Sequence, residues 1–121
     1  MTAGAEGMEG LLHAFSSALE EGNAARFLAT IDRRRCPGYA ALEDNVVALL
    51  AQNSVGSSIG ITGQTRQQDS YELKLDWLLQ IRPAGGARPA VVRRQTIRCR
   101  IERSGKGWKV TALEPAGFFR P

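Results

Sequence analysis

The sequence predicts an α+β domain in which three N-terminal helices pack on a strongly curved four-stranded antiparallel sheet, a cone with an internal cavity. Two observations lead to this prediction. Apolar residues recur at helical spacing up to residue 52, and from residue 55 onward they alternate with polar residues in four runs. Turn-forming residues at 67–70, 83–89 and 104–107 separate the runs, as expected for a meander. The length, 121 residues, fits one domain over 1–121.

The helices are expected at residues 6–21, 23–31 and 37–52. Gly22 suits the end of the first helix, because glycine adopts the left-handed conformation found after helix C-termini. Asn23 is a favourable N-cap for the second, and Pro37 suits the start of the third. The predicted buried faces consist of Met8, Leu11, Leu12, Phe15, Leu19, Phe27, Leu28, Ile31, Tyr39, Leu42, Val46, Leu49 and Leu50.

The strands are expected at residues 55–66, 71–82, 91–103 and from 108 to about 115. The second strand gives the clearest signal, since its odd-numbered residues are apolar and most of its even-numbered residues are polar. We expect Phe118 and Phe119 to cover one end of the core. The predicted inward residues are Val55, Ser57, Ile59, Ile61, Tyr71, Leu73, Leu75, Trp77, Leu79, Ile81, Val91, Arg93, Gln95, Ile97, Cys99, Ile101, Trp108, Val110 and Ala112.

The net charge of +4 is unevenly distributed, with −3 in residues 1–53 and +7 in residues 54–121. A basic sheet can attract anionic partners, but arginine and lysine also keep an exposed sheet face soluble. We expect the second role and no nucleic-acid partner, because no stacking aromatics or recognisable binding motif accompany the charge. No apolar run suggests a membrane span or a signal peptide, so we expect a cytoplasmic location for the chain as written, or export if a leader was removed.

The cysteine and histidine content argues against a metal site. Cys36 and Cys99 lie far apart in the sequence, and His13 is the only histidine, so the usual zinc-ligand spacing is missing. No metal and no cofactor are expected. A disulfide between the two cysteines is one alternative. A small buried thiol at Cys99, which falls on the apolar side of its strand, is the favoured one.

The chain resembles the nuclear-transport-factor-2-like superfamily, a cone-shaped, cystatin-like fold that includes ketosteroid isomerase, scytalone dehydratase and SnoaL-like polyketide cyclases. The resemblance rests on the order of helices and strands, on residues 27–32 leaving the second helix, and on Gly107-Trp108-Lys109-Val110-Thr111 in the last strand. Trp77-Leu78-Leu79 and the end at residues 118–121 are similar to an uncharacterised bacterial branch. Members often dimerise through the outer sheet face, which implies a homodimer, and Leu78 is an apolar residue on that face.

A catalytic role is not expected, because no inward strand position is acidic. Asp76 falls on the outward face, where a cross-strand charge pair explains it. Asp32 is the best remaining acid, either as a carboxylate at the mouth of a pocket or as a partner of Arg33–Arg35 and a cap of its loop. Those arginines themselves suit either a helix C-terminus or an anion.

The favoured hypothesis is non-catalytic binding of a small, mostly apolar molecule in the cone. The alternatives are a protein-interaction or dimeric assembly module with a filled cavity, and an enzyme of the isomerase or dehydratase type. A cavity of a few hundred Å³ would favour the first and a packed interior the second. The pocket candidates are Asp32, Tyr39, Tyr71, Trp77, Arg93, Gln95 and Trp108, with the polar Arg93 and Gln95 as ligand-orienting groups.

Overall fold

The computed structural model describes residues 3–86, 88–105 and 107–121, with side chains from residue 7 onward. Positions 87 and 106, in two of the predicted turns, lie outside this part, as does the side chain at position 6. The elements are α1 (Ala3–Glu20), α2 (Ala24–Ala29), α3 (Tyr39–Gln52), β1 (Asn53–Gln67), β2 (Ser70–Pro83), β3 (Val91–Ser104), β4 (Gly107–Glu114) and a 3₁₀ turn, η1 (Ala116–Phe119). No described helix is long and apolar enough to cross a membrane.

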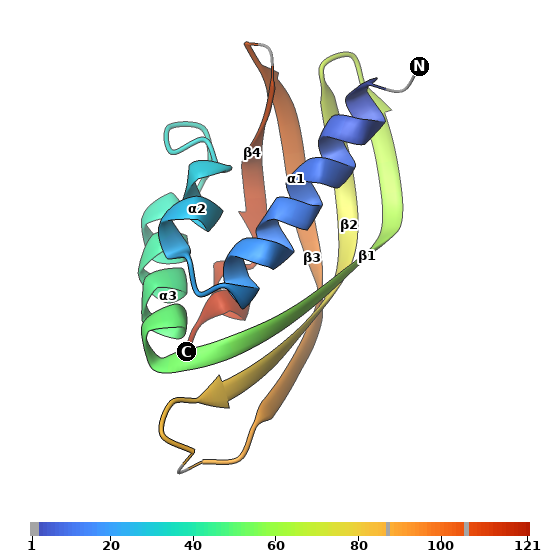
Figure 1. Cartoon of the computed structure of the whole chain (residues 1–121). Coiled ribbons are helices and arrows are strands. Elements are labelled where there is room, and N and C mark those ends of the chain that lie inside the picture. The colour runs from blue at the N-terminus through green and yellow to red at the C-terminus, as the bar shows by residue number, and fades with distance from the viewer. Residues whose placement is uncertain (1–2, 87, 106) are drawn as a thin grey trace.

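The strands form one antiparallel meander in the order β1-β2-β3-β4. The sheet is strongly bent, and α1 crosses its concave face while α2 and α3 lie beside β4 (Figure 1). The predicted α+β cone is confirmed. β1 and β4 are the two edge strands.

Local sequence signals account for the helix ends. Gly22 has φ of 70°, as expected after α1. The side chain of Asn23 accepts a hydrogen bond from Arg26 N at 2.9 Å, which caps α2. α2 ends two residues earlier than predicted, because the backbone around Ile31 bridges to Val110 of β4 instead of continuing the helix. α3 begins at Tyr39, after Pro37.

The inward face of β2 was predicted correctly over its whole length. Its odd-numbered residues from Tyr71 to Ile81 are at most 3% exposed. On the neighbouring strands the predicted pattern ends sooner, since Ile61 is 40% and Val91 49% exposed. Both side chains lie on the concave face of the sheet. Their exposure shows that the helices and η1 do not cover this face as far as Ile61 and Val91.

The expected inward position of Ala112 is wrong. Arg100 pairs with Ala112 and Ile101 with Val110, so Thr111 is an extra residue that forms a bulge. The bulge reverses the alternation, and Leu113 points inward opposite Cys99 in place of Ala112. Thr111 is buried, and its hydroxyl has no hydrogen-bond partner among the described residues.

Candidate functional site

Five aromatic rings fill the interior of the cone. Trp77 is fully buried, and its ring centroid lies 5.1 Å from that of Phe119, 5.9 Å from Phe15 and 6.1 Å from Phe118. Phe27 completes the cluster, 4.7 Å from Phe15 and 5.6 Å from Phe119. The predicted cover by Phe118 and Phe119 therefore extends into the cone, where both rings pack against Trp77.

The other aromatic candidates lie away from this cluster. Tyr71 is buried and packs against the half-buried Trp108 with a centroid distance of 5.5 Å. The guanidinium of Arg66 lies 5.7 Å from the Tyr71 ring, and that of Arg103 lies 5.9 Å from the Trp108 ring. Arginine thus covers the pair from outside. Tyr39 is half-buried at the start of α3, where Arg33 stacks on its ring.

Arg93 holds the C-terminal segment in place. Its Nη1 donates to the carbonyl oxygens of Phe118 at 2.8 Å and Arg120 at 2.6 Å. Burial lowers the pKa of the Arg93 guanidinium, and the charge of Arg120 lowers it further. Gln95 is exposed, because β4 pairs with β3 only as far as Arg98 and leaves this part of β3 uncovered. The two predicted ligand-orienting residues are neighbours on one face of β3, opposite Leu79 and Trp77, but only Arg93 is held by contacts with the C-terminal segment.

Asp32 caps its own loop. Its Oδ1 accepts hydrogen bonds from the backbone N–H groups of Arg34 at 3.0 Å and Arg35 at 3.1 Å, and its Oδ2 accepts one from Arg35 Nε at 2.9 Å. The Arg35 side chain is the largest cause of the lowered pKa of Asp32, and the backbone bonds add to it. This geometry matches the loop-cap alternative considered from the sequence.

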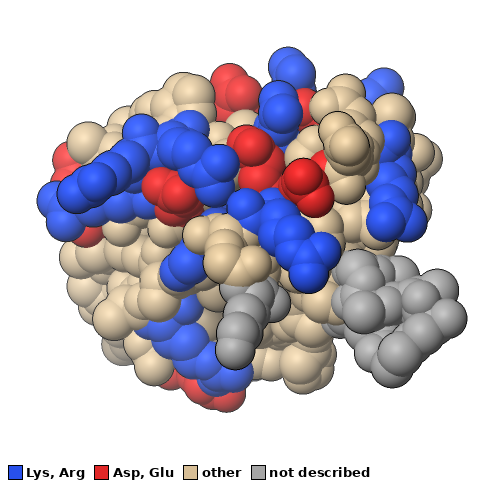
Figure 2. All heavy atoms as spheres, turned by 90° about the horizontal axis from the view of Figure 1, so that it is seen from above, with Lys and Arg blue, Asp and Glu red and all other residues tan. Residues whose placement is uncertain are grey.

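Arg35 also belongs to a chain of ion pairs at one end of the molecule. It lies 3.4 Å from Glu102, which lies 3.4 Å from Arg100, which in turn pairs with Glu72. Seen from above, this end shows lysine and arginine side chains interspersed with acids (Figure 2). On the outer sheet face Arg94 binds Asp76 through two contacts of 2.9 and 2.6 Å, which lowers the pKa of Asp76. The cross-strand pair predicted for Asp76 exists, with Arg94 as its partner.

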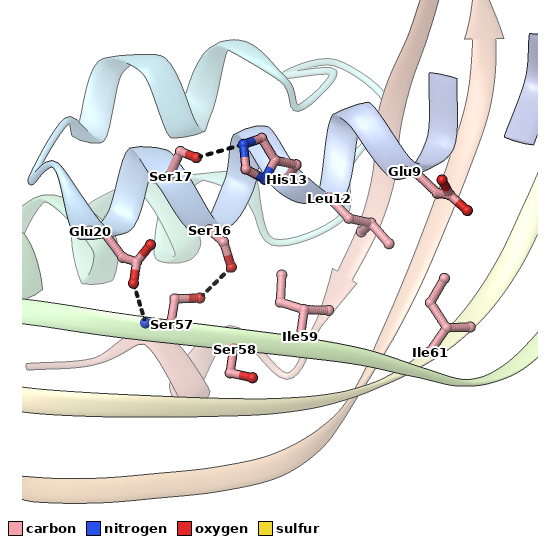
Figure 3. A pocket seen from close by; sticks show the side chains of 10 residues that line it. All are labelled: Glu9, Leu12, His13, Ser16, Ser17, Glu20, Ser57, Ser58, Ile59 and Ile61. Carbon is pink, nitrogen blue, oxygen red and sulfur yellow. Dashed lines mark hydrogen bonds between the residues drawn. The ribbon is translucent and has the colours of Figure 1, made fainter. Parts of the chain in front are cut away.

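A groove of about 560 Å³ lies between α1 and β1. Ser57, Ile59 and Ile61 rise from β1 toward the helix, whereas Ser58 points away from it (Figure 3). The helix contributes one polar row at spacings of three and four residues, with Leu12 beside it. The lining residues are Glu9, Leu12, His13, Ser16, Ser17, Glu20, Ser57, Ser58, Ile59 and Ile61.

Ser57 links this groove to the aromatic core. Its hydroxyl accepts a hydrogen bond from Trp77 Nε1 at 2.9 Å and lies 2.8 Å from the hydroxyl of Ser16. Its backbone N–H donates to Glu20 Oε2 at 3.4 Å, a long bond. On the exposed side of α1, His13 Nε2 lies 3.4 Å from Ser17 Oγ. Carboxylates, hydroxyls and one imidazole can hold a cationic or hydrogen-bonding partner here.

Two further hollows lie on the surface. One of about 790 Å³ on the outer sheet face adjoins the bulge between Ile61 and Gly63 and includes Lys74, Arg98 and Glu114. The other, of about 360 Å³, lies at the rim of the cone beside Pro121 and Arg93. Among the pocket candidates from the sequence, only Arg93 lines any of these three hollows. In the described part of the chain, no group of three or more metal-ligating side chains comes together.

The groove was not foreseen from the sequence. Ser57 was assigned to the inward face of its strand, but its hydrogen bond to Trp77 depends on how β1 and β2 are paired, with Ile59 opposite Trp77. A signal did exist in α1, where Glu9, His13 and Glu20 follow one another at intervals of about one and two helical turns. That row pointed to a polar face, but not to the strand opposite it.

Comparison with known proteins finds relatives in structure only. No family model matches the chain, and no curated protein matches it. A conserved protein from Planctomyces limnophilus superposes with a TM-score of 0.75 at 12% identity, covering 93% of this chain and 94% of that one. A candidate dehydratase of the nuclear-transport-factor-2-like family from Streptomyces avermitilis gives 0.69 at 14%, covering 90% and 92%.

A third solved structure is also similar to this chain in fold. A nuclear-transport-factor-2-like protein with a cystatin-like fold from Novosphingobium aromaticivorans gives a TM-score of 0.66 at 18% identity, covering 90% of this chain and 78% of that one. At identities this low, the superpositions establish a shared fold alone. Function must be argued from the side chains of this chain.

Proposed function

We propose that this chain, which has the nuclear-transport-factor-2-like fold, is a non-catalytic protein-interaction module whose cone interior is filled by its own side chains. The observation that carries the proposal is the packing of Trp77 against Phe15, Phe118 and Phe119, all at most 1% exposed. Interiors packed in this way are structural cores. Ligand pockets, by contrast, keep open a volume of several hundred Å³.

The packing favours this function over small-molecule binding in the cone. A ligand would have to displace Phe118 and Phe119, and Arg93 fixes the backbone of that segment through two hydrogen bonds. Removing a buried phenylalanine from a core costs about 3–5 kcal/mol, which a small apolar ligand would have to offset. The interior therefore stabilises the domain, and binding is left to its surfaces.

The character of the buried polar groups favours the module over an isomerase or dehydratase. Catalysis inside the cone needs a general base, a carboxylate or imidazole within reach of a substrate bound there. In the described residues, the buried polar side chains are those of Ser70 and Thr111. Asp76 lies outward in its pair with Arg94, and Asp32 is held by Arg35. The dehydratase description belongs to the Streptomyces avermitilis protein and does not transfer at 14% identity.

Native mass spectrometry of the purified protein tests this proposal. We expect a mass that corresponds to protein alone, monomer or homodimer, without a bound small molecule, and the same result for Trp77→Phe, which keeps an aromatic ring in the cluster. A small molecule that co-purifies with the wild type and is lost in Trp77→Phe would overturn the proposal, because it would place a ligand against Trp77. Circular dichroism of the wild type and of the variant verifies that both are folded.

A further inference from the structure

The two edges of the sheet differ in how far other segments of the chain cover them. The edge of β4 is covered, since Val110 N donates to Thr30 O at 2.9 Å and Asp32 N donates to Val110 O at 2.8 Å. Lys109 Nζ adds a bond to Ala29 O at 2.6 Å. Along the outer edge of β1, within the described residues, no backbone hydrogen bond arrives from outside the sheet. An uncovered edge offers its N–H and C=O groups to another strand.

One hydrogen bond shows which backbone N–H and C=O groups of β1 face its outer edge. The N–H of Ser57 is directed at Glu20, away from β2. In an antiparallel pair the backbone groups alternate between the two sides of a strand. The N–H and C=O groups of Ile59 therefore share this edge with those of Ser57. The alternation continues to Ile61, where the bulge at Thr62 begins. This stretch of edge runs along the α1–β1 groove.

The first part of β1 lacks the features that usually block strand addition. Natural edge strands carry charged residues or proline against unwanted pairing. Residues 53–61 contain neither, although the strand continues to Gln67. The protection that exists is the single long contact from Glu20 to Ser57, which a better-placed acceptor can replace. A strand edge kept open beside a groove is suited to a peptide.

The groove lining indicates what kind of peptide would fit. Its apolar surface comes from Leu12, Ile59 and the 40% exposed Ile61. Glu9 and Glu20 lie toward its two ends (Figure 3), and neither lysine nor arginine lines it. The two glutamates are separated by about 16 Å along the helix, roughly the length of five residues of extended chain. Basic side chains near both ends and apolar ones between them would complement this surface.

We propose that the α1–β1 groove binds an extended basic segment of a partner protein by strand addition to β1. This inference rests on the proposed interaction function and gives it a surface and a partner. The segment donates to and accepts from the edge groups of Ser57 and Ile59, places apolar side chains against Leu12 and Ile61, and pairs its basic ends with the two glutamates. A second copy of this chain fits less well, because it would bring its own acidic α1 to an acidic groove.

A synthetic peptide, acetyl-Lys-Thr-Ile-Thr-Val-Thr-Lys-amide, tests the proposal by isothermal titration. We expect saturable binding that weakens several-fold in Glu9→Gln and in Glu20→Gln, and not in Glu43→Gln, a glutamate of α3 outside the groove. Ile59→Pro removes an edge N–H, whereas Ile59→Ala shortens the same side chain and keeps that N–H. We expect the proline variant to bind about tenfold more weakly than the alanine variant.

A second measurement does not depend on how the protein variants fold. N-methylation of alternate peptide amides removes the donors on one side of the added strand. We expect methylation on one set of alternate residues to abolish binding and methylation on the other set to leave it unchanged. Equal effects of the two sets would overturn strand addition.

Three other results would overturn the proposal as well. They are no binding of the peptide, equal affinity of Ile59→Pro and Ile59→Ala, and self-association of the chain through β1 that excludes the peptide. The last would identify a second copy as the occupant. Because none of these results places a ligand in the cone, a failure here remains distinguishable from a failure of the proposed function, which would appear as a small molecule bound against Trp77.

Discussion

The indole N–H of Trp77 donates to the hydroxyl of Ser57 at 2.9 Å, so the largest fully buried side chain of the described residues is anchored by a side chain that lines the surface groove. The same hydroxyl lies 2.8 Å from that of Ser16 on α1. Core, edge strand and helix thus meet at one oxygen atom. A substitution of Ser57 should therefore alter both the stability of the domain and the shape of the groove.

Ser57→Ala should lower the free energy of unfolding by about 1–3 kcal/mol, because it leaves the buried donor of Trp77 without an acceptor. Ser58→Ala is the matched control, since Ser58 is exposed and points away from the helix. Urea unfolding followed by tryptophan fluorescence measures both. Equal stabilities for the two variants would show that the Trp77 bond contributes nothing.

Phe119→Ala should cost about 3–5 kcal/mol and open a hole among the aromatic rings. Apolar cavities of this kind stay dry and bind benzene. We therefore expect benzene to raise the melting temperature of Phe119→Ala and to leave that of the wild type unchanged. A similar rise for both proteins would mean that the wild-type cone already contains usable space.

The loop cap at Asp32 should make stability depend on pH. Its pKa in the folded protein is lowered from the ordinary 3.8, mainly by Arg35. The stabilisation is therefore present above the unfolded-state pKa and is lost as pH falls through the folded-state pKa. We expect Asp32→Asn to be less stable than the wild type at pH 6, with the gap closing toward pH 2. Urea unfolding across this range is the measurement, with the exposed Asp44→Asn as control. A gap that stays constant would contradict this assignment.

Both cysteines should be unreactive in the folded protein. They are buried free thiols, and burial raises the pKa of Cys99 to about 12 and also raises that of Cys36. The thiolate, which is the reactive form, is therefore scarce at neutral pH. We expect Ellman's reagent to react slowly with the native protein and rapidly with both thiols in urea. Rapid native labelling would show that the core opens far more readily than its packing implies.

A homodimer through the outer sheet face stays a prediction. Leu78 is half-buried on that face, and the neighbouring Arg94 is paired with Asp76 of the same chain, so an interface there would bury ion pairs that are already complete. We expect sedimentation to show a dimer that Leu78→Asp converts to a monomer, while Gln80→Asp, further along the strand, perturbs it less. A wild-type monomer would contradict this prediction.

The parts of the fold set by local patterns were predictable. The alternation of β2, the cap at Asn23 and the glycine after α1 are each decided by residues close in sequence. The inward position of Leu113 was not, because the bulge at Thr111 reverses the alternation and nothing in the short run 107–114 marks it. A single extra residue in one strand is invisible to a periodicity argument.

The candidate site was harder to predict than the fold. Trp77 was correctly placed inward, but its role depends on Phe118 and Phe119 returning from the far end of the chain, and on Arg93 holding them. The groove depends on where α1 crosses β1, and the open edge of β1 depends on what the chain leaves uncovered. These are properties of the assembled structure, and alternation within one strand carries no information about them.

The packed cone can be tested most directly by determining a crystal structure of the wild-type protein under xenon pressure. Xenon enters apolar holes that are empty in the folded state. The account predicts no xenon among the rings of Phe15, Trp77 and Phe119. A well-occupied xenon atom between these rings would contradict it, since it would reveal an interior open to small apolar molecules.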